Sequence, residues 1–114
     1  YGLTDEQVEA MILESFDKAE ADFNERQVRE ARVEADRILA AVDKAKQSDA
    51  WFDLPAEEQA SVDRAINELH LSYHGDDHVL IQSKMESLDL ASRGLAENMM
   101  NSAVRNVLKG TKIE

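Results

Sequence analysis

The chain has no cysteine, one proline and four glycines among its 114 residues. Without cysteine it can form no disulfide, no thiol nucleophile and no thiolate metal site. The scarcity of proline and glycine, with abundant alanine, glutamate and leucine and no strict two-residue alternation, predicts an all-α fold. No apolar run approaches the ~20 residues that a membrane-spanning helix needs.

The charge is also one-sided, with 24 Asp or Glu against 13 Lys or Arg and a net charge of -11. Such a surface repels phosphate groups, so we expect neither nucleic acid nor an anionic membrane as a partner. There is no glycine-rich phosphate loop and no nucleophile elbow, so we expect no enzymatic activity, no catalytic residue and no bound cofactor within these residues. Because the chain begins with Tyr1 rather than methionine, we expect a fragment of a longer protein. Without a membrane span or a signal-peptide pattern, we expect that protein to be cytoplasmic.

The first predicted helix begins at Thr4, which forms a capping-box pattern with Gln7. Apolar residues then recur at helical spacing along one face. Those that we assign to a docking face, called the lever stripe below, are Val8, Ile12, Phe16 and Phe23. A homodimer or a partner helix could also cover this face.

After Phe23 the apolar face fades, and a second, long helix is expected from residue 16 to about residue 46. Charge pairs such as Asp22 with Arg26 and Glu25 with Arg29 would support it locally. At 1.5 Å per residue this helix is roughly 45 Å long, so it must extend beyond a small bundle.

The remaining pattern predicts a small antiparallel three-helix bundle. One helix starts near Pro55 and stops at Gly75 in a left-handed conformation, and another starts at Asp76 or Asp77 and is kinked or broken near Gly94. We expect Trp51, Phe52 and Leu54 to plug one end, and Met100, Val104 and Leu108 to complete the apolar face. The predicted parts are a lever, residues 1–34, and a bundle with a short tail, residues 35–114, whose compact part ends at residue 108.

Histidines recur every fourth residue in "HLSYHGDDH", and imidazoles at this spacing on one helix face can bind zinc or nickel. Gly75 interrupts the helix, however, and no H-E-x-x-H pattern is present. We therefore favour histidines at a solvated helix end, with His70 and His74 as weak metal candidates.

The order of these features resembles the C-terminal lid of the seventy-kilodalton heat-shock chaperones of the DnaK type. The segments that carry the resemblance are "YGLTDEQVEAMI" and "AEADFNERQVREARVEADRIL", and the likeness covers essentially the whole chain. Val33 stands where general members carry an asparagine. Val33, the "GDD" turn and the ending "SAVRNVLKGTKIE" together make the chain more similar to the branch of the family that serves iron–sulfur cluster assembly.

The resemblance implies that the lever rests on a β-sandwich subdomain of the same chain, absent from these residues, and that the lid gates a bound peptide. ATP would bind in a separate N-terminal domain of the full-length ATPase. The partners implied are the scaffold protein IscU and the co-chaperone HscB. Asp36 aligns with an aspartate that latches the family's lid to an arginine of the sandwich, whereas Ala40 replaces a second latch residue, a histidine.

Three alternatives remain open at this stage. Asp36 could simply pair with Arg32 one turn earlier on a solvated face. The chain could also be the lid of a general DnaK-type chaperone, or a stand-alone acidic helical adaptor that dimerises or binds a partner through the lever stripe.

Overall fold

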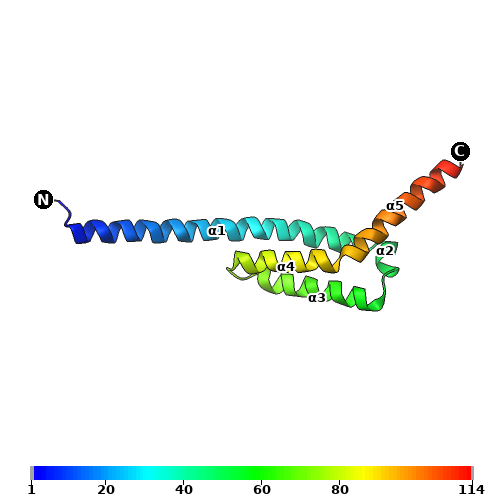
Figure 1. Ribbon diagram of the computed structural model, residues 1–114, viewed down its shortest axis with the longest axis horizontal. Coiled ribbons are helices and arrows are strands. Elements are labelled where there is room, and N and C mark those ends of the chain that lie inside the picture. Colours follow the sequence, from blue (N-terminus) through cyan, green and yellow to red (C-terminus); the bar gives the residue numbers. More distant parts are fainter. Residues whose placement is uncertain (1, 114) are drawn as a thin grey trace.

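The structure, a computed structural model, describes residues 2–113, and the side chains of residues 2–109. Within that range the chain forms five helices and no strand, which confirms the all-α prediction. The molecule is extended, with dimensions of 88 × 33 × 16 Å. One long helix passes over a pair of shorter helices, and the last helix projects from the end of the molecule that lies away from the N-terminus (Figure 1).

Helix α1 runs without interruption from Asp5 to Ala45. The predicted capping box is present: the Thr4 hydroxyl oxygen accepts from the Gln7 amide at 3.1 Å, and the Thr4 amide donates to Gln7 Oε1 at 2.9 Å. The sequence predicted a short helix followed by a long one, and this division is wrong. No glycine or proline occurs between residues 5 and 45, so nothing in the backbone interrupts the helix.

The ion pairs predicted along α1 are also wrong. Between residues 2 and 109, neither Asp22 with Arg26 nor Glu25 with Arg29 comes within ion-pair distance, whereas Glu14 and Lys18 lie 3.3 Å apart. Both side chains of that pair are well exposed, so it contributes only a few tenths of a kcal/mol. The first half of α1 therefore owes little of its stability to ion pairing.

A short helix, α2 (Asp49–Phe52), closes one end of the bundle. Trp51 and Leu54 are buried there as predicted, but Phe52 is 71% exposed and does not join the plug. Successive residues of a helix point about 100° apart, so the turn that buries Trp51 directs Phe52 toward solvent.

Helices α3 (Ala56–Tyr73) and α4 (His78–Ala91) form an antiparallel pair beneath the second half of α1 (Figure 1). Asp77 is the N-cap of α4, because its Oδ1 accepts from the Leu80 amide at 3.1 Å. The left-handed stop predicted at Gly75 is wrong, since no described glycine has a positive φ. His74 instead ends α3 in the right-handed region.

The core lies between α1, α3 and α4, and its fully buried large side chains are Val62, Leu69, Ile81 and Leu88. From α1 it receives mainly small residues, including Ala31 and Ala35, which let the helices approach closely. Burial on α1 begins at Val28, seven residues before the predicted boundary at residue 35. The bundle therefore supports α1 further toward its N-terminus than the sequence pattern indicated.

Helix α5 (Arg93–Ile113) follows a break at Ser92, which confirms the break predicted near Gly94. A Cβ atom on Gly94 would meet Glu58 Oε2 at 2.7 Å, a clash that the flexible Glu58 side chain can relieve by moving. Leu95 is buried, but Met100, Val104 and Leu108 are exposed. The sequence placed these three in the bundle, and the structure corrects that: beyond Leu95, α5 contacts α2 on one side only, and these three residues lie on its exposed side.

Candidate docking and latch surfaces

The lever stripe is exposed along the first half of α1. Its four side chains are between 40 and 68% exposed. With Leu3, Met11 and Ala19, its first three residues line a shallow apolar groove. This part of α1 extends beyond the ends of α3 and α4 (Figure 1), so no helix of the described chain covers it.

The lever stripe also faces a different direction from the bundle. At 100° per residue, its centre lies roughly 120° around α1 from the face that buries Val28, Ala31 and Ala35. A surface resting on the stripe would therefore approach α1 from a side that the bundle leaves open. An exposed apolar face of this extent is typical of an interaction site.

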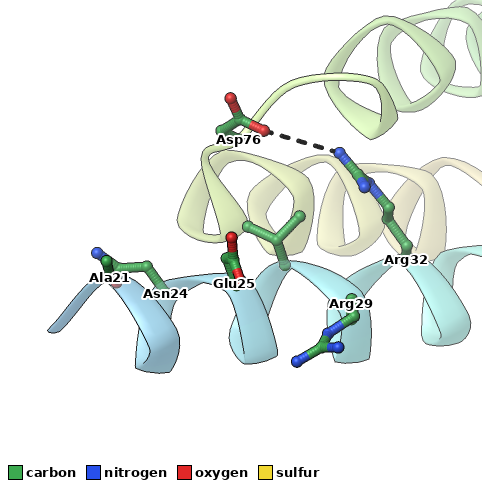
Figure 2. Close-up of a pocket in the computed structure, with 7 residues that line it drawn as sticks. Ala21, Asn24, Glu25, Arg29, Arg32 and Asp76 are labelled. Atoms are coloured by element: carbon green, nitrogen blue, oxygen red, sulfur yellow. Dashed lines mark ion pairs between the residues drawn. The ribbon is translucent and has the colours of Figure 1, made fainter. Parts of the chain in front are cut away.

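Where the lever meets the bundle, Arg32 binds the turn between α3 and α4. Its Nε donates to the Tyr73 carbonyl oxygen at 2.8 Å, and a terminal nitrogen donates to the Gly75 carbonyl oxygen at 2.9 Å. Figure 2 shows Arg32 reaching toward Asp76 of the turn, 3.9 Å away, whereas Arg29 points away from it. These bonds satisfy carbonyl groups at the end of α3 and fix the turn against α1.

The same corner forms an open pocket, whose wall is mainly one side of α1 and Asp76 of the turn. Glu25 and Asn24 line it on the lever side and Arg32 on the bundle side, so its charges are mixed. Sequence reasoning missed Arg32 as a structural residue, because its partners lie 41 and 43 residues away. The only signal was an arginine within a run of charged side chains.

Asp36, the predicted latch residue, is exposed on α1 and accepts a hydrogen bond from the Tyr73 hydroxyl at 3.2 Å. This hydrogen bond is the main cause that raises the pKa of Tyr73 above its usual value of 10.0, followed by desolvation and by the negative charge of Asp36. The alternative pairing of Asp36 with Arg32 is wrong. The Arg32 guanidinium group binds the α3–α4 turn, and the side chain that contacts Asp36 is that of Tyr73.

The predicted metal candidates are two histidines one helical turn apart. His70 and His74 lie near the end of α3, where the His74 ring contacts the Tyr73 ring edge-on, with centroids 5.2 Å apart. Among the described residues, no group of three or more potential ligands from His, Asp and Glu could hold a metal ion. In that same part of the chain, no helix has both the length and the apolar character to cross a membrane.

A long helix with one uncovered apolar half, supported by a small bundle, is the arrangement that the resemblance to the heat-shock chaperones implied. The chain belongs to the Hsp70 family, because the sequence profile of the Hsp70 protein family matches residues 1–101.

Within that family, several similar curated relatives carry the name chaperone protein HscA or HscA homolog. The protein from Photorhabdus laumondii is 37% identical over the whole chain, and its homologue from Azoarcus sp. strain BH72 is 36% identical over the same 114 residues. The homologue from Haemophilus influenzae is 36% identical over 113 residues, or 99% of the chain. The chain spans only 18% of the length of each of these relatives. These findings confirm that the chain is similar to the heat-shock chaperones and, among them, to the HscA proteins.

Proposed function

We propose that the chain is the helical lid of an HscA-like chaperone and that it controls how long a peptide stays bound to a neighbouring β-sandwich subdomain. The observation that carries this proposal is the lever stripe, which is apolar, exposed and directed away from the chain's own bundle. The share of its relatives' length that the chain spans supports it, since most of such a protein lies outside these residues.

In this proposal each part of the lid has its own role. The lever stripe rests on the sandwich, and burying one phenylalanine or isoleucine there is worth about 1.5–3 kcal/mol. The second half of α1 carries the bundle above the bound peptide. Asp36 pairs with an arginine of the sandwich as a latch, and Ala40 leaves that latch without the second contact of general family members.

The longer protein would be an ATPase through a separate N-terminal domain, and ATP binding there would open the lid. Its partners would be the scaffold protein IscU and the co-chaperone HscB, in iron–sulfur cluster assembly in the bacterial cytoplasm. The names of the relatives support this branch of the family, and Val33 agrees with it. No residue of this chain is assigned a catalytic role.

The proposal is tested in the longer chaperone with two adjacent substitutions, Ile12→Asp and Leu13→Asp. Both side chains are at least half exposed, but Ile12 lies in the lever stripe and Leu13 points about 100° away from it. A charge in the docking contact should favour the open lid. We therefore expect Ile12→Asp to speed the release of a fluorescent peptide in the ADP state by about tenfold, and Leu13→Asp to change it less than about twofold.

Equal release rates for Ile12→Asp and the unmodified chaperone would show that the lever stripe does not seat the lid. The latch has its own test, the release rate of Asp36→Asn in the same assay. If the arginine of the sandwich loses its charged partner, the peptide should be released faster. An unchanged release rate would remove Asp36 from the proposed mechanism.

A further inference from the structure

The carboxylate of Asp36 is contacted by a residue of another helix. The hydroxyl of Tyr73, the last residue of α3, donates to Asp36 Oδ2 at 3.2 Å, although the two residues are 37 positions apart in the sequence. The residues one turn away on α1 do not hold the carboxylate, because Arg32 binds the α3–α4 turn and Ala40 has no polar side-chain atom. Within the described part of the chain, the bond from Tyr73 is the only hydrogen bond or ion pair of the Asp36 side chain.

The Tyr73 side chain is itself held by several contacts. Its ring is half-buried and packs against the core. The guanidinium carbon of Arg32 lies 5.9 Å from the ring centroid, and the His74 ring meets the Tyr73 ring edge-on at 5.2 Å. Arg32 Nε also donates to the Tyr73 carbonyl oxygen at 2.8 Å, which holds the backbone of the same residue. A ring held in this way keeps its hydroxyl oxygen at a defined position beside α1.

The hydrogen bond engages one oxygen of the Asp36 carboxylate and leaves the other available. A carboxylate accepts up to about four hydrogen bonds through its two oxygens, and among the described residues Oδ1 has no partner. Asp36 is exposed, so a cationic group from outside the chain can approach it. The aspartate side chain has two or three staggered χ1 positions, of which the bond from Tyr73 favours one. The contact therefore orients the carboxylate in advance without blocking it.

We propose that Tyr73 is a positioning residue for the latch, and that its hydroxyl holds the Asp36 carboxylate in the orientation that the arginine of the sandwich meets. This inference rests on the proposed function, because that arginine lies outside these residues. It gives the bundle a part in the latch, since Tyr73 reaches Asp36 only when the end of α3 packs beside α1. The bond is long for an O–H···O contact, so Tyr73 biases the orientation of Asp36 without locking it.

The test is a double-mutant cycle on the release of a fluorescent peptide from the longer chaperone in the ADP state. Tyr73→Phe removes the hydroxyl and keeps the ring, and we expect it to speed release by about twofold, because the carboxylate then spreads over its χ1 positions. Asp36→Ala should speed release more, since the charge is lost as well. In the Asp36→Ala background Tyr73→Phe should have no effect, because no carboxylate is left to orient. The control Ser87→Ala removes an exposed hydroxyl that bonds within α4, and it should leave the release rate unchanged.

The same cycle contains the results that would overturn the inference. If Tyr73→Phe leaves release unchanged while Asp36→Ala speeds it, the latch works without Tyr73. An equal acceleration by Tyr73→Phe in both backgrounds would mean that the substitution only weakens the bundle, and slower release would mean that the hydroxyl competes with the arginine. Each of these results rejects Tyr73 as a positioning residue. If Asp36→Ala has no effect, the latch and this inference fail together, whereas Ile12→Asp in the same assay still reports whether the lever stripe seats the lid.

Discussion

Replacing Arg32 should weaken the bundle by an amount that depends on the shape of the new side chain. Its guanidinium group makes two charge-assisted hydrogen bonds, at 2.8 and 2.9 Å, to the carbonyl oxygens of Tyr73 and Gly75. Its centre also lies 5.9 Å from the centroid of the Tyr73 ring. A buried hydrogen bond to a charged group is worth about 1.5–3 kcal/mol. Because the Arg32 side chain is about one-third exposed, we assign about 1 kcal/mol to each of its two hydrogen bonds.

The ion pair with Asp76 adds little, because the Asp76 side chain is fully exposed and the separation is 3.9 Å. We therefore expect Arg32→Ala to lower the free energy of unfolding by about 2 kcal/mol. Arg32→Lys should lower it by about 1 kcal/mol, since an ammonium group keeps the charge but lacks the fork that reaches both carbonyls.

The assay is equilibrium unfolding in urea followed by ellipticity at 222 nm, with Arg29→Ala as the matched control. Arg29 is on the same helix and lines the same pocket, but among the described residues it makes no hydrogen bond or ion pair, so its loss should cost less than about 0.5 kcal/mol. The reasoning is refuted if Arg32→Lys is as stable as the unmodified chain, because charge alone would then explain the contact. It is equally refuted if Arg32→Ala and Arg29→Ala cost the same.

Three further predictions address the core, the hydrogen bond between Tyr73 and Asp36, and the N-terminal cap of α1. Leu69→Ala, at a fully buried site, should cost about 3 kcal/mol in urea unfolding, whereas Leu71→Ala, at an exposed site on the same helix, should cost less than about 0.5 kcal/mol. The raised pKa of Tyr73 should appear as a high midpoint in absorbance at 295 nm, with the other tyrosine replaced by phenylalanine, and Asp36→Asn should lower that midpoint. Because the pKa is higher in the folded state, the contribution to stability is complete below pH 10 and is lost as pH rises through the folded-state pKa. Thr4→Ala removes about 1 kcal/mol from the start of α1, so amide exchange there should accelerate about fivefold while the urea midpoint stays constant.

Features that depend on neighbouring residues could be predicted from the sequence. The capping box at Thr4 and the cap at Asp77 are examples, because a cap needs only a side-chain oxygen and an amide three residues further on. The break near Gly94 could also be predicted locally, because glycine has a low helix propensity. Burial in the plug was less predictable, since the pattern grouped Phe52 with Trp51 although a single helical turn cannot direct both inward.

Features that depend on distant residues could not be predicted. The partners of Arg32 are more than forty residues away, and nothing in its local sequence distinguishes it from Arg29. The direction of α5 was missed for a related reason. Its sequence shows an apolar face, but which way that face points depends on long-range contacts such as the hydrogen bond from Asn98 to the Ala50 carbonyl oxygen, 48 residues away. The sequence therefore showed that Met100, Val104 and Leu108 form an apolar face of α5 without showing that this face is exposed.

The continuity of α1 bears directly on how a lid of this kind would move. The helix has no glycine or proline between residues 5 and 45, and its second half is packed through small side chains such as Ala31 and Ala35. Bending it would break backbone hydrogen bonds and separate closely packed helices, whereas the contact between the lever stripe and a sandwich involves only exposed side chains. Movement would therefore release the lever stripe before it bends α1. Lever and bundle would then leave the bound peptide together, as one rigid piece.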